Sequence, residues 1–126
     1  MSVGERSLIE LVHELTSDSP EGREEACNVV RDWLHTFDQR EAALIAYLLA
    51  SAAVLENDPD ILESALFAVC ELTTTGFIQA EDISPLRKIR GADLKGSELG
   101  HLKYLESEYF TVEPESTGLM SGSGGG

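Results

Sequence analysis

The sequence is poor in basic residues. It holds 9 lysines and arginines against 23 aspartates and glutamates, so the formal net charge over its 126 residues is −14. This deficit argues against non-specific nucleic-acid binding, because a phosphate backbone would be repelled by the protein. It argues in the same way against docking on an anionic membrane surface. The partner that the charge favours is a basic protein.

Cysteine is scarce as well, with two residues in the chain. Cys27 and Cys70 are too few for a disulfide scaffold, and both fall in apolar helical patterns typical of small buried side chains. The first residues lack the basic start and apolar run of a signal peptide. The longest uncharged stretch, residues 42–55, is shorter than the roughly 20 residues of a membrane-spanning helix. These features predict a reduced, cytoplasmic protein.

Motifs of catalysis and metal binding are also missing. The chain has no Walker loop and no Gly-x-Ser-x-Gly, Cys-x-x-Cys or His-Glu-x-x-His pattern. Its histidines fall on separate predicted helices, without ligand spacing and on polar faces. These are His13, His35 and His101. Helix capping and the helix dipole explain the carboxylates of Asp58, Asp60 and Glu63 better than a cation site does. We therefore expect no catalytic, cofactor-binding or metal-ligating residues, and no enzyme.

What the sequence does contain is helical periodicity. Apolar residues recur at intervals of three and four, which predicts helices and no strands. The expected helices span residues 4–16, 20–37, 39–56, 59–72, 86–90 and 97–109. Ser19 and Asp58 should cap helices that begin with proline, while Asp38 and Glu41 have the spacing of a capping box. The third helix is apolar almost all round, so we expect it at the centre of the fold.

The second and fourth helices align at an offset of 39 residues, which pairs Ala26 with Ala65 and Val30 with Val69. This interval is close to the length of a HEAT or armadillo repeat, about 40 residues. We predict one all-α domain over residues 1–110, in which antiparallel helical hairpins stack as a small HEAT-like bundle of five to six helices. A closed four-helix bundle is the alternative. Residues 111–126 have the composition of a flexible, linker-derived tail.

One segment of the chain resembles a HEAT-type hairpin. It reads Asp58-Pro-Asp-Ile-Leu-Glu-Ser-Ala-Leu-Phe-Ala-Val-Cys-Glu-Leu and is followed by Gly76 and Ile83-Ser-Pro-Leu-Arg. Over residues 20–90 the small acidic chain is also similar to bacterial immunity proteins encoded beside polymorphic toxins. The resemblance implies a stoichiometric inhibitor that binds its toxin and blocks the active site. Many such toxins are basic nucleases, which an acidic inhibitor would meet rapidly through electrostatic steering.

Negative charge is concentrated in residues 1–76, which carry four basic and fifteen acidic groups, a net −11. Capping and dipole effects account for acids at helix starts, but not for the shortage of lysine and arginine on the helix faces. Because turns on one side of a hairpin stack line up, we expect four acids to share an edge. These are Glu21, Glu24, Asp38 and Glu41.

The acidic faces and helix-opening turns are the predicted contact surface, with an exposed aromatic side chain as an anchor. The candidate partner-binding residues are Glu25, Asp32, Asp38, Glu41, Asp58, Asp60 and Tyr47. Tyr47 fits the core equally well. A basic counter-patch consists of Arg87, Lys88, Arg90, Lys95 and Lys103. We interpret it as an internal neutraliser that pairs with acids such as Glu81 and Asp82, with an anion site as the alternative.

Two other classes of function fit the sequence. A HEAT-like scaffold or adaptor would hold a peptide or partner protein on an apolar face and bind independently of salt. A small enzyme or ligand carrier would need a pocket that joins some of the histidines, Cys70 and the carboxylates. The sequence leaves the oligomeric state open, because one group of apolar residues fits either the core or an interface. This group is Phe77, Ile78, Tyr104, Tyr109 and Phe110.

Overall fold

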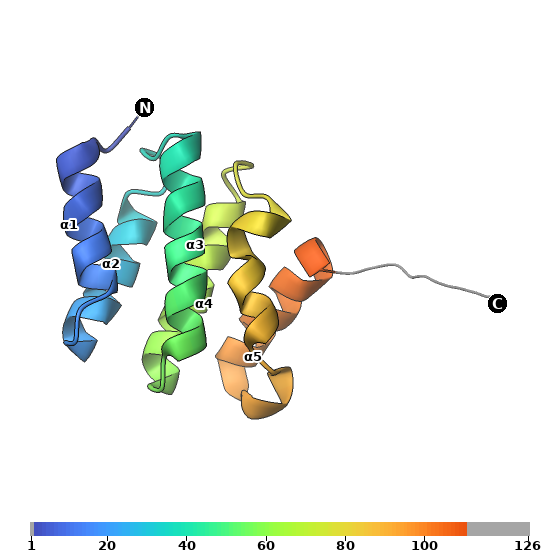
Figure 1. Cartoon of the computed structure of the whole chain (residues 1–126). Coiled ribbons are helices and arrows are strands. Elements are labelled where there is room, and N and C mark those ends of the chain that lie inside the picture. The colour runs from blue at the N-terminus through green and yellow to red at the C-terminus, as the bar shows by residue number, and fades with distance from the viewer. Residues whose placement is uncertain (1, 111–126) are drawn as a thin grey trace.

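The computed structural model describes residues 2–110, and within this range every regular element is a helix and none is a strand (Figure 1). The predicted all-α class is therefore confirmed. The elements are α1 (Glu5–Leu15), α2 (Pro20–Asp32), α3 (Gln39–Leu55), α4 (Pro59–Thr73), η1 (Ala80–Lys88), η2 (Gly91–Asp93), α5 (Gly96–Leu105) and η3 (Glu106–Phe110). The tail predicted for residues 111–126 lies outside the described residues.

The helices form two layers. Figure 1 shows α1, α3 and η1 side by side in one layer, with α2, α4 and α5 behind them. The packing agrees with this view, because α3 contacts both α1 and η1, while α4 contacts both α2 and α5. Helices α1 and α2 pack together, as do α3 and α4. The chain thus passes from one layer to the other at each turn, and the result is a small bundle of stacked helical hairpins.

The helix starts follow local side-chain chemistry. The Ser19 hydroxyl accepts a hydrogen bond from the Gly22 amide at 3.1 Å, with Pro20 as the first residue of α2. The Asp58 carboxylate accepts from the amide of Asp60 at 2.8 Å at the start of α4. The Asp38–Glu41 capping box is present at the start of α3. Because each cap satisfies backbone N–H groups that have no partner within the helix, all three starts lie where the sequence predicts them.

Three of the predicted helices have clearly different bounds. The last, predicted for residues 97–109, is divided into α5, which ends at Leu105, and η3. Helix α2 ends at Asp32, and residues 33–36 form a turn in which the Thr36 amide donates to the Trp33 carbonyl. Leu34 in this turn and Phe37 directly after it are both buried in the core. The helix predicted for residues 86–90 is instead part of η1, a 3₁₀ segment that begins at Ala80. Its start is fixed by a hydrogen bond from the Gln79 amide to the Asp82 carboxylate.

Helix α3 lies at the centre, as its apolar composition predicts. It contacts α1, α4 and η1, and its buried side is built mostly from alanines, which let the neighbouring backbones approach closely. These buried residues include Ala42, Ile45, Ala46, Leu49, Ala50 and Ala53. Of the apolar residues left open by the sequence, Ile78 joins the core, whereas Tyr104 is exposed. Phe77, Tyr109 and Phe110 are half-buried against the core.

His101 does not lie free in solvent as the sequence predicts. Its ring stacks on Phe67, with centroids 5.2 Å apart and planes 12° from parallel. Its Nε2 lies 2.9 Å from a carboxylate oxygen of Glu63, which therefore pairs with the histidine instead of serving the helix start. The Arg31 guanidinium carbon lies 4.2 Å from the Phe67 ring centroid. The three side chains Arg31, Phe67 and His101 thus join α2, α4 and α5.

Replacing Phe67 with alanine should lower the free energy of unfolding by about 2 kcal/mol, since both the aromatic stack and the contact with the Arg31 cation are lost. Urea denaturation followed by circular dichroism measures the change. Tyr104→Ala, at an exposed aromatic on α5, is the matched control and should have little effect. Equal losses in the two variants would show that the stack does not stabilise the fold.

Candidate functional site

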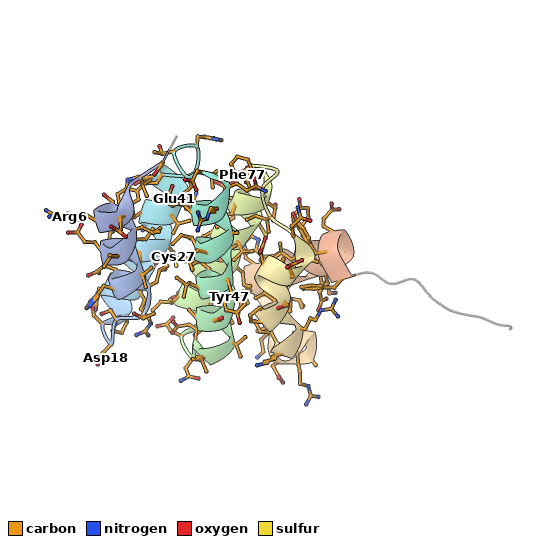
Figure 2. All side chains as sticks on the ribbon, turned by 45° about the horizontal axis from the view of Figure 1, so that its top comes forward. Arg6, Asp18, Cys27, Glu41, Tyr47 and Phe77 are labelled. Carbon is orange, nitrogen blue, oxygen red and sulfur yellow. The ribbon has the colours of Figure 1, made fainter. Side chains whose placement is uncertain are left out.

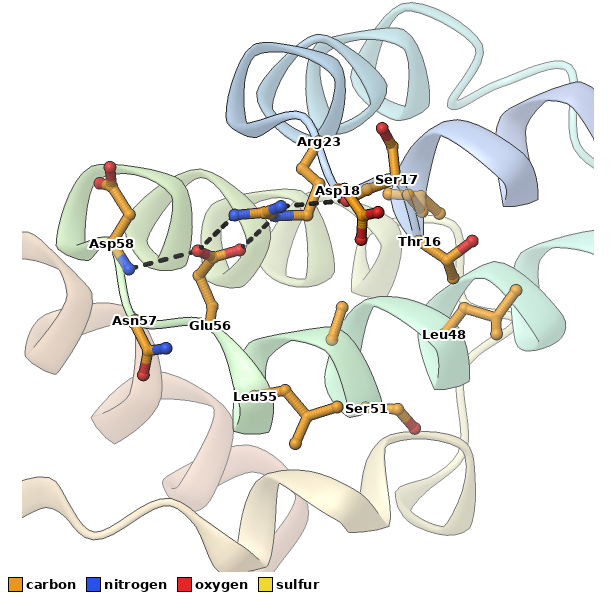
Figure 3. A pocket seen from close by; sticks show the side chains of 12 residues that line it. Thr16, Ser17, Asp18, Arg23, Leu48, Ser51, Leu55, Glu56, Asn57 and Asp58 are labelled. Carbon is orange, nitrogen blue, oxygen red and sulfur yellow. Dashed lines mark hydrogen bonds and ion pairs between the residues drawn. The ribbon is translucent and has the colours of Figure 1, made fainter.

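A groove opens between the turn that joins α1 to α2 and the C-terminal end of α3 (Figure 3). Its volume is about 580 Å³. One wall comes from Thr16, Ser17 and Asp18, and the other from the last two turns of α3 and the turn into α4. The groove exists because α1 and α3 each end here, and the turns that follow them lead away into the second layer of helices.

The floor and one lip of the groove are apolar. Leu15 is buried at its base, Leu48 is half-buried in its wall, and Leu55 stands 79% exposed at its edge. Leu44 and Tyr47 lie nearer the start of α3 and are 43% and 48% exposed; Figure 2 labels Tyr47 on this helix. Their spacing of three, four and seven residues places these side chains on one helix face. We call Leu44, Tyr47, Leu48 and Leu55 the α3 stripe.

An ion pair closes the inner end of the groove. The Arg23 side chain donates from Nε to Glu56 Oε1 at 2.9 Å and from Nη2 to Glu56 Oε2 at 3.1 Å (Figure 3). A third donor of Arg23, Nη1, binds the Ser17 carbonyl at 3.0 Å. The hydrogen bonds to Glu56 raise the pKa of Arg23 above its ordinary value, against the opposing effect of desolvation. The pair therefore holds the α1–α2 turn against the end of α3.

Acidic side chains surround the open side of the groove. Asp18 and Asp58 line it, and Glu21 and Asp60 lie close by in the first turns of α2 and α4; all four are exposed. Within residues 2–110, none of the four forms an ion pair. Arg23 also interacts electrostatically with Asp18 and Asp58, but its direct hydrogen bonds go to Glu56, so negative charge is in excess at this edge. We call these four residues the acidic edge.

The predicted shared edge of Glu21, Glu24, Asp38 and Glu41 is wrong. Asp38 caps the first turn of α3, whereas Arg23 of α2 binds Glu56 just beyond the last turn of α3. The two groups of acids lie at opposite ends of a 17-residue helix, which is about 25 Å long. The turns that do line up are α1–α2 and α3–α4, because each hairpin returns to the same end of the stack.

The structure separates the predicted partner-binding residues. Asp58, Asp60 and Tyr47 lie at the groove or on the α3 stripe and are exposed. Glu25 and Asp32 are exposed on α2, in the other layer of helices. Asp38 lies at the far end of α3. The candidate residues therefore do not form one continuous surface.

Glu41 is turned into the protein and does not suit the contact surface for which it is predicted. It is 8% exposed, and its carboxylate accepts hydrogen bonds from four groups. These are the hydroxyl of Ser2 at 2.8 Å and the amides of Val3, Gly4 and Asp38 at 3.1, 3.3 and 3.0 Å. Desolvation raises the pKa of Glu41, but these hydrogen bonds outweigh it and hold the pKa below its ordinary value. Glu41 thus fixes the N-terminal residues to the start of α3.

The two thiols have little reactivity at neutral pH. Burial raises the pKa of Cys27 to about 12, with nearby Glu56 and Glu24 adding to the effect. Burial also raises the pKa of Cys70 to about 11. A thiol with such a pKa is almost wholly protonated at pH 7 and is a poor nucleophile. In the part of the chain that the structure describes, no group of three histidine, cysteine or acidic side chains could hold a metal ion.

The basic counter-patch is not paired internally in the way the sequence predicts. All five of its residues are exposed, and within residues 2–110 none of them forms an ion pair. Arg87 instead covers the ring of Phe110, with its guanidinium carbon 4.4 Å from the ring centroid. Positive charge therefore gathers on η1, on α5 and at the residues that flank η2. Lys88 and Arg90 line a second hollow, which shares Glu56 and Asn57 with the groove. Between residues 2 and 110, no helix has the length and apolar character needed to cross a bilayer.

Sequence reasoning missed the groove and every residue of the α3 stripe except Tyr47. Because α3 is apolar almost all round, its outward face does not stand out from its buried face in a hydropathy pattern. The signal that remains is size: the buried face is rich in alanine, whereas the outward face carries Leu44, Tyr47, Leu48 and Leu55. Large apolar side chains opposite an alanine face indicate a second contact surface.

No protein-family model, curated protein or solved structure matches the chain.

Proposed function

We propose that the chain is a non-catalytic, acidic protein-binding module, and that it acts as an immunity-type inhibitor which binds and neutralises a basic bacterial toxin. The observation that carries the proposal is a groove with an apolar floor that adjoins the exposed α3 stripe and an acidic edge, in which no carboxylate forms an ion pair within residues 2–110. A basic partner would complement this charge, and its apolar side chains would cover Leu55 and Tyr47.

The two parts of the site would make different contributions to binding. The acidic edge would speed association with a basic partner, and this effect weakens as salt screens the charges. The α3 stripe would supply affinity through burial of apolar area, which depends little on salt. An inhibitor needs both, because it must meet its toxin quickly and release it slowly.

The second candidate is a HEAT-like scaffold or adaptor that binds a peptide or partner protein through its apolar face. The α3 stripe favours it, since three large apolar side chains on one helix are more than 40% exposed. The two candidate functions differ in how strongly partner binding depends on salt and in whether the partner is toxic to the cell. An adaptor needs no electrostatic steering, and its partner need not be toxic.

The test begins with a basic protein captured from host lysate with the chain as bait. Reversing two charges with Asp18→Lys and Asp60→Lys should slow association with that protein about 10-fold at low salt and flatten the salt dependence. Stopped-flow fluorescence measures both quantities. The control is Glu106→Lys with Glu108→Lys, which changes the net charge equally at exposed residues of η3. Equal slowing by both pairs would contradict the acidic edge as the contact surface.

The inhibitor role is tested in growing cells. Expression of the captured protein alone should arrest growth, and co-expression of the chain should restore it. The Asp18→Lys, Asp60→Lys variant should protect less well than the η3 control. A captured protein that leaves growth unaffected would contradict the inhibitor role and favour the adaptor.

A further inference from the structure

We infer that the groove and the α3 stripe bind a cationic amphipathic helix of the partner, an inference that rests on the proposed binding of a basic protein. The stripe extends from Leu44 to Leu55, which is about 16 Å or three helical turns at 1.5 Å per residue. Its large side chains are spaced by three, four and seven residues along one straight ridge. A second helix that lies beside α3 can match this spacing with apolar residues of the same period.

Other ways of recognising a peptide do not fit this surface. Addition of a strand requires a free sheet edge, and residues 2–110 contain no strand. A proline-rich segment binds between closely spaced aromatic side chains, but the stripe has one aromatic residue, Tyr47. A phosphorylated peptide needs a cluster of arginines, whereas the groove is lined by Asp18 and Asp58 around one arginine that is already paired with Glu56. Of these modes, a helix in the groove is the one that the surface fits.

The charges around the stripe set the character of the bound helix. Asp18 and Asp58 lie at the Leu55 end, where the groove is. Arg40 is exposed in the first turn of α3, at the Leu44 end. Lysine or arginine side chains of the partner helix should therefore gather on the groove side of Leu55, where they meet Asp18 and Asp58. They should be disfavoured near Arg40 and near Lys88 and Arg90, which line the neighbouring hollow with Asn57. This polarity distinguishes a cationic helix from an uncharged apolar helix.

Fluorescein-labelled peptides of leucine and lysine, about 18 residues long, test the inference by fluorescence anisotropy. One peptide has its leucines at helical spacing, and a second has the same composition with strict alternation. The first should bind the full chain about 10-fold more tightly than the second and should gain helical circular dichroism on binding. A helical peptide of leucine and glutamate should bind much more weakly than either lysine peptide, because the negative charge of the chain repels it at low salt.

Protein variants then locate the site. Leu44→Ser with Leu55→Ser should weaken binding of the helical lysine peptide about 10-fold. Ile9→Ser is the matched control, because Ile9 is 58% exposed on α1, outside the groove lining, and it should leave binding unchanged. All these positions are exposed, and thermal melts of each variant check that the fold is intact.

The outcomes separate this inference from the proposed function. Equal binding of the two lysine peptides would contradict the binding of a helix by the α3 stripe. Equal effects of Ile9→Ser and of Leu44→Ser with Leu55→Ser would contradict it as well. If Asp18→Lys with Asp60→Lys still weakened both lysine peptides in that case, the acidic binding module would stand without the helix. If neither the leucine pair nor the charge pair affected any peptide, both would fail.

Discussion

Replacing Glu41 with alanine should lower the free energy of unfolding by about 2–3 kcal/mol, because several hydrogen bonds to one ionised carboxylate are lost at once. The carboxylate accepts from Ser2, Val3, Gly4 and Asp38. Without it the Asp38 amide loses its capping partner, and the residues before α1 lose their attachment to α3. Urea denaturation followed by circular dichroism measures the change.

Gln39→Ala is the matched control for this prediction. Gln39 lies two residues before Glu41 in the first turn of α3, but its side chain is exposed. Its removal should change the free energy of unfolding by less than about 0.5 kcal/mol. Similar losses in the two variants would show that the hydrogen bonds of Glu41 contribute nothing beyond the helix itself.

The pKa of Glu41 also gives its contribution a pH dependence. Because hydrogen bonds hold the pKa below the ordinary value of 4.5, the folded state binds this proton less readily than the unfolded state. The stabilisation is therefore complete above pH 4.5 and is lost as the pH falls through the lowered pKa of the folded state. Glu41→Gln removes the ionisable group, so the variant should lose less free energy of unfolding on acidification than the unmodified chain does. The difference in stability between variant and unmodified chain should therefore be larger at pH 7 than at pH 2.

Local chemistry made much of the fold predictable from the sequence. Ser19, Asp38 and Asp58 mark helix starts because a short polar side chain before a helix satisfies N–H groups only a few residues away. The central place of α3 follows in the same way from its composition, since a helix that is apolar all round needs neighbours on several sides. In each case the deciding residues lie within one helix.

Contacts between distant residues were not predictable in this way. Glu41 shows the limit: its capping-box partner Asp38 is three residues away, whereas Ser2, which also binds it, is 39 residues away. The pairing of His101 with Glu63 spans 38 residues. No local pattern encodes such pairs, because they depend on which helices become neighbours in the stack.

The site was predictable only in part for a related reason. Asp58, Asp60 and Tyr47 lie at the groove or on the α3 stripe, but Asp38 lies at the other end of α3 from the groove, about 25 Å along the helix. Acidic composition predicts the sign of a surface, whereas the alternation of hairpin turns decides which acids meet. The exposure of Leu55 was not predictable from the sequence, because it depends on where α1 and α3 end and not on the residues next to Leu55.

The two faces of α3 should respond in opposite ways to the same substitution. Leu49→Ala should lower the free energy of unfolding by about 3 kcal/mol, since Leu49 is fully buried and its loss leaves a cavity between packed helices. Leu44→Ala, on the exposed side of the same helix, should change it by less than about 1 kcal/mol. Urea denaturation compares the two variants directly.

Binding should show the reverse order. Leu44→Ala should weaken the helical lysine peptide because it removes part of the α3 stripe, whereas folded Leu49→Ala, measured at low temperature without denaturant, should bind like the unmodified chain. This contrast follows from the division of α3 into a buried side that holds the bundle together and an exposed side that is free to meet a partner. If Leu44→Ala destabilised the fold as much as Leu49→Ala does, the outward leucines would belong to the core, and the stripe would not be available for binding.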